Sequence, residues 1–405
     1  MKLFPFFKSE YIFYCIVLSF SIILYDFANG KMQSYFMLFW LYVSPFVLVI
    51  KSFCHKFASR EHLLLFFILF LIIDSIYNIH SFRLSTIAFS CMFIFTYLYF
   101  TTIVDELRLS PNKIVHFLSN IVKMFCFVLV IQQIATIFHL PVFNRGWLPA
   151  DEYKWNSLAN EPSYIAQTLL ILIFTVVKFN ELIAGKKLTL SQQLNKDKYL
   201  WISYLYTNLT CFSVSCVIAV VLLSFYFFKL KNIVSISLFI VLLSCGILCL
   251  ADNKLILRLL DLFSIILTLD PVTIYNVDPS SSARIIPFIY YFNEFEILNI
   301  NFWLGFGCDY ADNHWINLLF NGNSETSQGI GGIINNMYDY GLVPFVFFFR
   351  YIIKLVGFKS FYMFLYITAF LIFGLNLYLT WIYLMMCFTY IVYKDKYQLS
   401  LGAST

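Results

Sequence analysis

A carboxylate lies at the junction between a polar segment and an apolar one, in the motif Asn160-Glu161-Pro162-Ser163. Glu161 can take a proton from a hydroxyl group or orient it there, and Ser163 adds a second hydrogen-bonding group. The motif also suits a plain helix start, because Asn160 can cap the helix and Pro162 lacks the N–H that a first turn leaves unpaired. Glu161 is therefore a candidate catalytic residue and Ser163 a candidate substrate-binding residue, with helix capping as the alternative.

Three arginines lie in the two longest polar segments of the chain: Arg145, Arg258 and Arg284. A guanidinium group keeps its charge and binds phosphate oxygens through paired hydrogen bonds. Arg145 and Arg284 are thus candidates to hold a diphosphate, with Arg284 also a candidate for the catalytic step. Arg258 is a further candidate for substrate binding. A contact with lipid head groups or water explains each arginine equally well when it is taken alone.

The segment from Gly305 to His314 combines two closely spaced glycines with three potential metal ligands. The spacing of Asp309, Asp312 and His314 matches no established metal site, so no metal is predicted. His314 is instead a candidate catalytic base or hydrogen-bond donor. Gly305 and Gly307 indicate a tight backbone beside a substrate, although a lone Gly-x-Gly specifies no phosphate site. A solvated loop remains the plain alternative.

A polar stretch precedes the apolar run that starts near residue 342, and it ends in Tyr340-Gly341. Such an entry into an apolar run is typical either of close helix packing or of the lining of a site. Asn335 and Tyr340 are therefore candidate substrate-binding residues.

The composition predicts the solvent around these groups. Of 405 residues, 61% are hydrophobic and 12% are charged, and the mean hydropathy is +0.80. A soluble chain carries roughly twice that charged fraction. Long apolar runs in lipid must satisfy their own backbone groups, which favours helices, and the alternation of barrel strands is missing. We therefore predict an all-α polytopic membrane protein, in contact with membrane lipid along most of its length.

About twelve apolar segments are long enough to be considered as spans. They are 11–25, 34–50, 63–78, 86–103, 117–140, 162–178, 199–213, 214–228, 233–250, 342–356, 361–375 and 377–393. Residues 199–228 and 361–393 could each form one long helix instead of two. Splitting both puts about 18 Lys and Arg residues inside and about 7 outside, as the positive-inside rule requires. This count favours two cytoplasmic termini.

The same arrangement leaves two long outer segments, 141–161 and 251–340, attached to a single membrane domain spanning 1–405. Loops of this length usually carry function. In the larger loop, between spans 9 and 10, residues 255–269 and 284–298 are predicted to form amphipathic helices on the membrane surface. The ten cysteines lie mostly in apolar runs, which predicts no disulfide framework. The basic residues are scattered over short loops, so the net charge of +5 does not indicate nucleic acid.

This layout resembles the O-antigen polymerase (Wzy-type) family, and more distantly the O-antigen ligases. The motifs that carry the resemblance are Glu161-Pro162-Ser163, Arg284, Gly305-Phe306-Gly307 and Tyr340-Gly341. The resemblance implies a glycosyltransferase at the periplasmic face of the bacterial inner membrane, without a metal or other cofactor. Its substrates would be glycans on undecaprenyl diphosphate, and a partner protein would regulate chain length. The hydroxyl of a new repeat unit would attack the growing chain, and lipid diphosphate would leave.

Two alternatives remain open. Ligases of this kind carry a histidine close before the final glycine of the loop, whereas segment 330–340 has none, which favours the polymerase. A flippase or other transporter of lipid-linked sugars would carry charge through many spans. Here such charge is sparse, at Asp74, Lys123 and Arg350. The polar residues gather in the outer loops, which favours chemistry at the surface over passage.

Overall fold

The computed structural model is α-helical, as predicted. It describes residues 8–24, 28–29, 33–52, 59–78, 84–144, 155–211, 213–227, 264–265, 269–277, 279–308, 310–311, 314 and 332–402. Within these ranges, strand structure is limited to one antiparallel pair of two-residue strands, β1 (Ala28–Asn29) and β2 (Gln33–Ser34). This small pair lies between the first two helices, where no strand was predicted.

Most of the longer helices follow the predicted apolar segments, while the short helices α7, α12, α14 and α16 lie outside them. Their bounds are α1 (Ser9–Ser21), α2 (Tyr35–Ser52), α3 (His62–Tyr77), α4 (Leu84–Glu106), α5 (Pro111–Ile137), α6 (Pro162–Ala184), α7 (Leu190–Lys196), α8 (Lys198–Thr210), α9 (Val214–Phe227), α12 (Pro271–Val277), α13 (Pro279–Glu294), α14 (Ile300–Leu304), α16 (Ile333–Tyr340), α17 (Leu342–Val356), α18 (Phe361–Leu365), η4 (Tyr366–Phe370) and α19 (Tyr378–Gly402). The predicted span 233–250 lies outside the described residues.

Three of the described helices are long and apolar enough to cross a membrane: Ile87–Glu106, Pro111–Ile137 and Pro162–Ala184. Shorter apolar helices occupy Ser9–Ser21, Tyr35–Ile50, His62–Tyr77, Ser215–Phe227 and Phe361–Phe370. These helices are those expected of a membrane protein.

Helix ends follow local sequence signals. Pro111 and Pro162 occupy the first turns of α5 and α6, where the missing N–H costs nothing. Gly185 ends α6 in the left-handed conformation, with φ at +64°, which a residue without Cβ adopts freely. Thr189 and Gln192 form a reciprocal capping box at the start of α7.

Residues 199–228 form two helices, as the charge distribution favoured. Lys123 of α5 pairs with Asp197 just before α8, and Gln133 further along α5 donates to Thr210 at the end of α8. The helices α5 and α8 therefore run in the same direction. By the same logic α6 and α9 are parallel, because their starts meet at Pro162 and Cys216 and their later parts at Lys178 and Tyr226.

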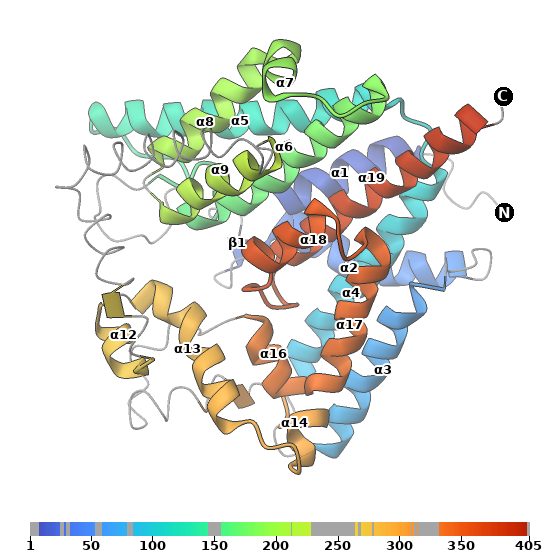
Figure 1. The fold of residues 1–405 in the computed structure, drawn as a ribbon, viewed down its shortest axis with the longest axis vertical. Coiled ribbons are helices and arrows are strands. Elements are labelled where there is room, and N and C mark those ends of the chain that lie inside the picture. The colour runs from blue at the N-terminus through green and yellow to red at the C-terminus, as the bar shows by residue number, and fades with distance from the viewer. Residues whose placement is uncertain are drawn as a thin grey trace.

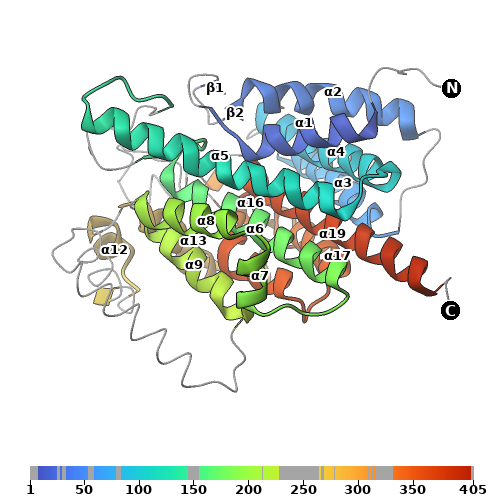
Figure 2. The ribbon, with the colours of Figure 1, turned by 90° about the horizontal axis from the view of Figure 1, so that it is seen from above.

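The connection between α8 and α9 is consequently a reversal and not a kink. Lys196 Nζ, just before α8, donates to the carbonyl oxygen of Asn180, near the end of α6, so α8 runs opposite to α6. Since α9 is parallel to α6, α8 and α9 run in opposite directions. The two helices are therefore separate and antiparallel, and they pack against each other (Figures 1 and 2).

Helix α19 is the centre of the fold and contacts both α6 and α4. Its residues 378–389 are all buried, as expected of a helix that is apolar on every side. Figure 1 shows α5 to α9 on one side of it and α2 to α4 with α17 on the other, while α12, α13, α14 and α16 lie together at one end of the molecule.

The second ambiguous segment, 361–393, is also divided. The short helix α18 continues as the π-helix η4, in which the Leu371 N–H donates to the carbonyl of Tyr366. Residues 371–377 then form turns before α19 begins at Tyr378. A π-turn within an apolar segment is uncommon and often marks a functional site.

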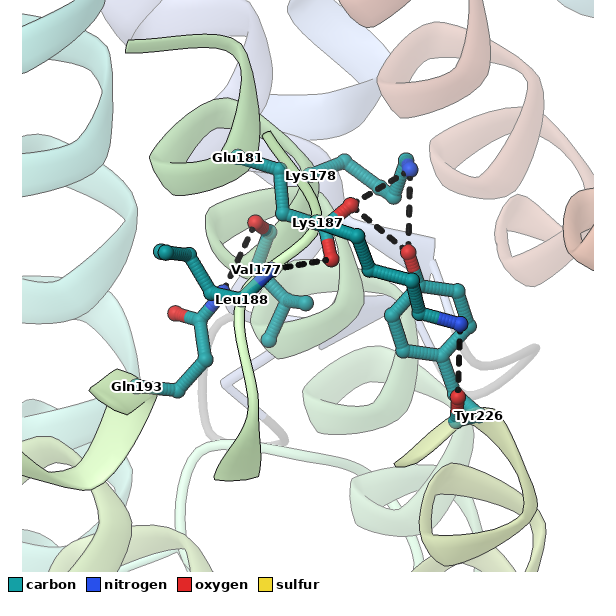
Figure 3. A network of polar contacts seen from close by, with 7 residues as sticks. All are labelled: Val177, Lys178, Glu181, Lys187, Leu188, Gln193 and Tyr226. Carbon is teal, nitrogen blue, oxygen red and sulfur yellow. Dashed lines mark hydrogen bonds and ion pairs between the residues drawn. The ribbon is translucent and has the colours of Figure 1, made fainter. Parts of the chain in front are cut away.

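A buried polar network fastens the far end of α6. The Glu181 carboxylate accepts hydrogen bonds from Lys178 Nζ at 2.7 Å, from Tyr226 Oη at 2.6 Å and from the Leu188 N–H at 3.3 Å (Figure 3). Lys187 Nζ donates to the carbonyl of Tyr226 and lies over its ring. These bonds join the ends of α6 and α9 to the loop that follows α6.

Candidate functional site

A carboxylate, an imidazole and a phenol meet beside α16. His314 Nε2 lies 2.9 and 3.1 Å from the two carboxylate oxygens of Glu294, the last residue of α13. The hydroxyl of Tyr338, on α16, donates to the same carboxylate at 2.8 Å. The Glu294 and His314 side chains are 31% and 23% exposed, so a ligand in water can reach both.

The hydrogen bonds of this cluster define the role of each ring nitrogen. With Nε2–H donating to Glu294, Nδ1 of His314 is the acceptor, and Tyr310 Oη lies 3.5 Å from it. Burial, followed by the bond to Glu294, holds the pKa of Tyr338 well above its ordinary value. Tyr338 therefore stays protonated and serves as a hydrogen-bond donor.

Aromatic rings form one wall of the cluster. The ring of Tyr310 stacks between those of Phe306 and His314, at centroid distances of 4.7 and 5.1 Å. Tyr338 and Tyr291 continue this wall and meet edge to face at 5.0 Å. Broad aromatic faces next to hydrogen-bonding groups suit a ligand that has both apolar and hydroxyl-bearing surfaces, as a sugar ring does.

The segment that carries Phe306 and Gly307 caps the end of α16. The N–H groups of Phe306 and Gly307 donate to the carbonyl oxygens of Tyr338 and Asp339, which have no partner inside the helix. The buried carboxylate of Asp339 accepts the N–H of Ala311, three residues before His314. These bonds fix the position of the histidine relative to Tyr338.

Two glycines allow this cap to form. Gly305 has φ at +105°, and a Cβ there would lie 2.4 Å from the carbonyl oxygen of Asp339. Gly341 has φ at +87°, and a Cβ there would lie 2.4 Å from the carbonyl oxygen of Trp303. The ends of α14 and α16 thus cross backbone against backbone, where no side chain fits. The two glycine motifs serve this close packing.

A buried carboxylate from α3 lies beneath the crossing. Asp74 Oδ1 accepts a hydrogen bond from Asn78 at 2.7 Å, and Asn78 also donates to the carbonyl oxygen of Gly305 at 3.4 Å. The other carboxylate oxygen of Asp74 is buried with no hydrogen bond among the described residues. The sequence analysis noted Asp74 only as a charge within an apolar run.

The turns between η4 and α19 connect α16 to the rest of the fold. Asn336, on α16, accepts the N–H of Leu375 at 2.8 Å, and Ser90 on α4 donates to Asn376. Phe373 and Tyr378, at the two ends of these turns, both pack edge to face against Tyr164 of α6. The start of α6 and the helix α16 therefore both contact the short segment between η4 and α19.

Glu161 stands at that start of α6 as its N-cap residue. Its side chain makes no capping bond, and the hydroxyl of Ser163 donates to its carboxylate at 3.1 Å. The residue at the N-cap position is thus Glu161, and not Asn160 as the capping alternative expected, while Pro162 lies in the first turn as predicted.

The loop before Glu161 is held from within the protein. Gln132 of α5 is fully buried, accepts the N–H of Ser157 at 2.8 Å and donates to the carbonyl oxygen of Phe143 at 2.7 Å. Asn156 donates to the carbonyl oxygen of Ala159 at 2.8 Å. The described parts of this loop, residues 141–144 and 155–161, are therefore held by buried hydrogen bonds.

The structure brings most of the predicted residues into two neighbouring groups. His314, Gly305, Gly307 and Tyr340 gather around α16, and Glu161 with Ser163 lies at the start of α6. Asn335 and Tyr340 are buried in the protein, so they support the site through packing and are not open to a ligand in water. Tyr340 packs its hydroxyl 3.7 Å from Cys308 Sγ.

The arginines are described less fully. Arg284 lies within α13, the helix that ends at Glu294, whereas its side chain and the whole of Arg145 and Arg258 lie outside the described residues. The predicted amphipathic helix 284–298 exists with different bounds, 279–294. The predicted helix 255–269 lies mostly outside the described residues.

Glu294, Tyr338 and Asp339 were missed as site residues. Their partners are far away in the sequence, so spacing does not reveal them. One available signal is that Glu294 follows two tyrosines and a phenylalanine, which is an unusual setting for a carboxylate. Within the described residues no group of three His, Cys, Asp or Glu side chains could hold a metal ion.

The arrangement can hold a hydroxyl-bearing ligand and accept its proton. Glu294 fixes the tautomer and orientation of His314, whose Nδ1 then faces the aromatic wall as an acceptor. A hydroxyl that displaces Tyr310 from Nδ1 would be placed for deprotonation. No protein-family model, curated protein or solved structure matches this chain.

Proposed function

We propose that the chain polymerises lipid-linked O-antigen repeat units at the periplasmic face of the bacterial inner membrane. The observation that carries this proposal is the cluster of Glu294, His314 and Tyr338, partly exposed beside an aromatic wall. It supplies an oriented base for an acceptor hydroxyl and a surface for sugar rings. Lipid diphosphate is a good leaving group, so positioning and anion binding are the remaining requirements.

Each residue then has a role. His314 takes the proton of the acceptor hydroxyl, Glu294 orients the imidazole, and Tyr338 holds the carboxylate. Arg284 is ten residues before Glu294 on α13, about 15 Å along a helix, and binds the diphosphate of the donor. Glu161 orients a second sugar hydroxyl at the start of α6.

The proposal includes a topology of about twelve spans with both termini cytoplasmic. It places Glu161 and the bend between α8 and α9 on the outer face, and Cys216 Sγ lies 3.5 Å from the carbonyl oxygen of Pro162. It places Lys178 and the end of α9 near the inner face, where Lys178 and Tyr226 are bonded. Both contacts support the alternation of helix directions that this topology requires.

One observation favours an O-antigen ligase as the second candidate. The ring of His314 lies 5.9 Å from that of Tyr338, on the helix that ends at Gly341. A histidine is therefore close to the final glycine in space, although not in sequence. The transporter is less well supported, because Lys123 is paired with Asp197 and Arg350 is exposed.

A deletion strain tests these functions on one gel of lipopolysaccharide. Loss of a polymerase leaves the lipid A core with a single repeat unit. Loss of a ligase leaves a bare core with chains on the carrier lipid, and loss of a flippase leaves a bare core without periplasmic chains. The first pattern is expected, and either of the others would overturn the proposal.

Complementation of that strain then tests the site. Glu161→Ala and Arg284→Ala are expected to reach wild-type amounts in the membrane, by immunoblot, and still to give only the single-repeat product. Normal chain-length ladders from both variants would remove these residues from the site.

A further inference from the structure

The bend between α8 and α9 holds two thiols in direct contact. Cys211 follows the last residue of α8, Cys216 lies in the first turn of α9, and their sulfur atoms are 2.9 Å apart. Both are free thiols with fully buried side chains. A disulfide bond is about 2.05 Å long, so the two sulfur atoms would need to approach each other by about 0.9 Å to form one.

This pair stands out among the described cysteines. Cys308 meets a tyrosine hydroxyl, and within the described residues no other two cysteine sulfurs lie within hydrogen-bonding distance of each other. Cys216 Sγ also contacts the carbonyl oxygen of Pro162, the residue that follows Glu161. The pair therefore lies directly behind the start of α6.

We propose that Cys211 and Cys216 form a disulfide bond in the mature protein. The inference rests on the orientation given in the proposed function, in which this bend faces the periplasm. That compartment is oxidising and supports stable disulfides, whereas the cytoplasm is reducing. The sequence indicated no disulfide framework, and a single local bond across one bend is compatible with that.

The reaction is a thiol–disulfide exchange. The two S–H bonds break, one S–S bond forms, and two electrons and two protons pass to the disulfide of a periplasmic oxidoreductase, which leaves as a dithiol. Because both sulfur atoms are buried in the folded chain, the exchange takes place before α8 and α9 close on α6. After closure, reductants in water do not reach the bond.

The bond closes only a short loop, so it removes little entropy from the unfolded chain. Its effect is local and geometric. It fixes the reversal between α8 and α9 and, through the contact of Cys216 with Pro162, the backbone beside Glu161.

Two-step alkylation of the full-length protein in membranes tests the bond. The protein is first denatured and treated with iodoacetamide, then reduced and treated with N-ethylmaleimide. Both cysteines lie in one tryptic peptide, residues 199–229, whose labels are read by mass spectrometry. Cys211 and Cys216 are expected to carry the second label, while Cys126 and Cys387 carry the first.

Single variants provide the matched control. In Cys211→Ser, Cys216 should move to the first label, and in Cys216→Ser the same should hold for Cys211. Reduction of the wild-type protein without denaturant should leave the pair unlabelled by the first reagent. First labels on both residues in the wild type would overturn the inference, and so would a second label on the remaining cysteine of a single variant.

The labelling does not measure chain growth, so the two proposals fail separately. A reduced pair in a strain with normal polymerase behaviour overturns the disulfide alone. An oxidised pair combined with unaltered lipopolysaccharide in the deletion strain overturns the proposed function alone.

Discussion

Glu181 and Glu294 have nearly the same partners and different surroundings. Each carboxylate accepts a hydrogen bond from a nitrogen base and from a tyrosine hydroxyl: Lys178 and Tyr226 for Glu181, His314 and Tyr338 for Glu294. The Glu181 side chain is only 7% exposed, while that of Glu294 is 31% exposed. One network is enclosed by protein and the other is open to a ligand.

The identity of the base separates the two further. Lys178 carries a compact ammonium group, and its bond to Glu181 helps to fasten α6 to α9. His314 has two ring nitrogens, so its imidazole can hold Glu294 with one and offer the other to a ligand. The comparison shows how one set of side chains serves architecture in one place and chemistry in another.

The largest expected effect is on activity, at the open network. In His314→Gln the amide keeps a hydrogen bond to Glu294 and loses the titratable nitrogen. Chain elongation should fall about 10²–10⁴-fold, the usual contribution of a general base. The rate of polymer formation from lipid-linked repeat units measures this, with the amount of folded protein as the reference. An active His314→Gln enzyme would place the base elsewhere.

The enclosed network should show the opposite behaviour. Glu181→Ala removes the carboxylate that Lys178, Tyr226 and the Leu188 N–H share, and breaking a buried ion pair costs about 3 kcal/mol. The thermal unfolding of the detergent-solubilised protein should shift down by several degrees, while the activity per folded molecule is retained. A loss of activity without a loss of stability would contradict the division between the two networks.

The crossing beneath the open network gives a third and smaller effect, with a control at hand. Gly305→Ala puts a methyl group against the carbonyl oxygen of Asp339, so α16 must move and elongation should fall by about tenfold or more. Gly357 also has a positive φ, yet nothing lies within 4 Å of its added Cβ. Gly357→Ala should cost only about 1 kcal/mol of stability and leave elongation unchanged. If both variants lowered elongation equally, backbone strain alone, without the collision with Asp339, would explain the loss.

The smallest effect is expected at the edge of the enclosed network. Lys187 is exposed, bonds to the carbonyl oxygen of Tyr226 and lies 4.3 Å from the centre of its ring. Lys187→Ala should lower stability by less than about 1 kcal/mol, because water competes for an exposed cation. The thermal unfolding of Lys187→Ala and Glu181→Ala, measured under the same conditions, compares the two losses of stability.

Apolar length predicted most of the longer helices, whereas the short helices α7, α12, α14 and α16 were not predicted. The reversal between α8 and α9 could be predicted because Lys229 and Lys231 would otherwise lie on the wrong side of the membrane. The strand pair β1 and β2 could not be predicted, since two residues carry no periodicity. The π-helix η4 could not be predicted either, because the periodicity of apolar residues does not separate one π-turn from an α-helix.

The candidate site could be predicted only in part. Glu161 was recognisable as a carboxylate at the start of an apolar run, and His314 as a potential base within a polar segment that also holds two glycines. The pairing of Glu294 with His314 depends on how the ends of α13 and α16 meet, which no local pattern encodes. Gly305 and Gly341 were recognised as motifs, but their purpose is visible only when each is found against the backbone beside the other.

That crossing has an evolutionary consequence. A side chain at either glycine collides with main-chain atoms of the other segment, so neither position can change while the helix ends stay in place. The surrounding apolar residues can exchange with one another at little cost. Distant relatives should therefore carry glycine at both of these positions, even where the neighbouring residues differ.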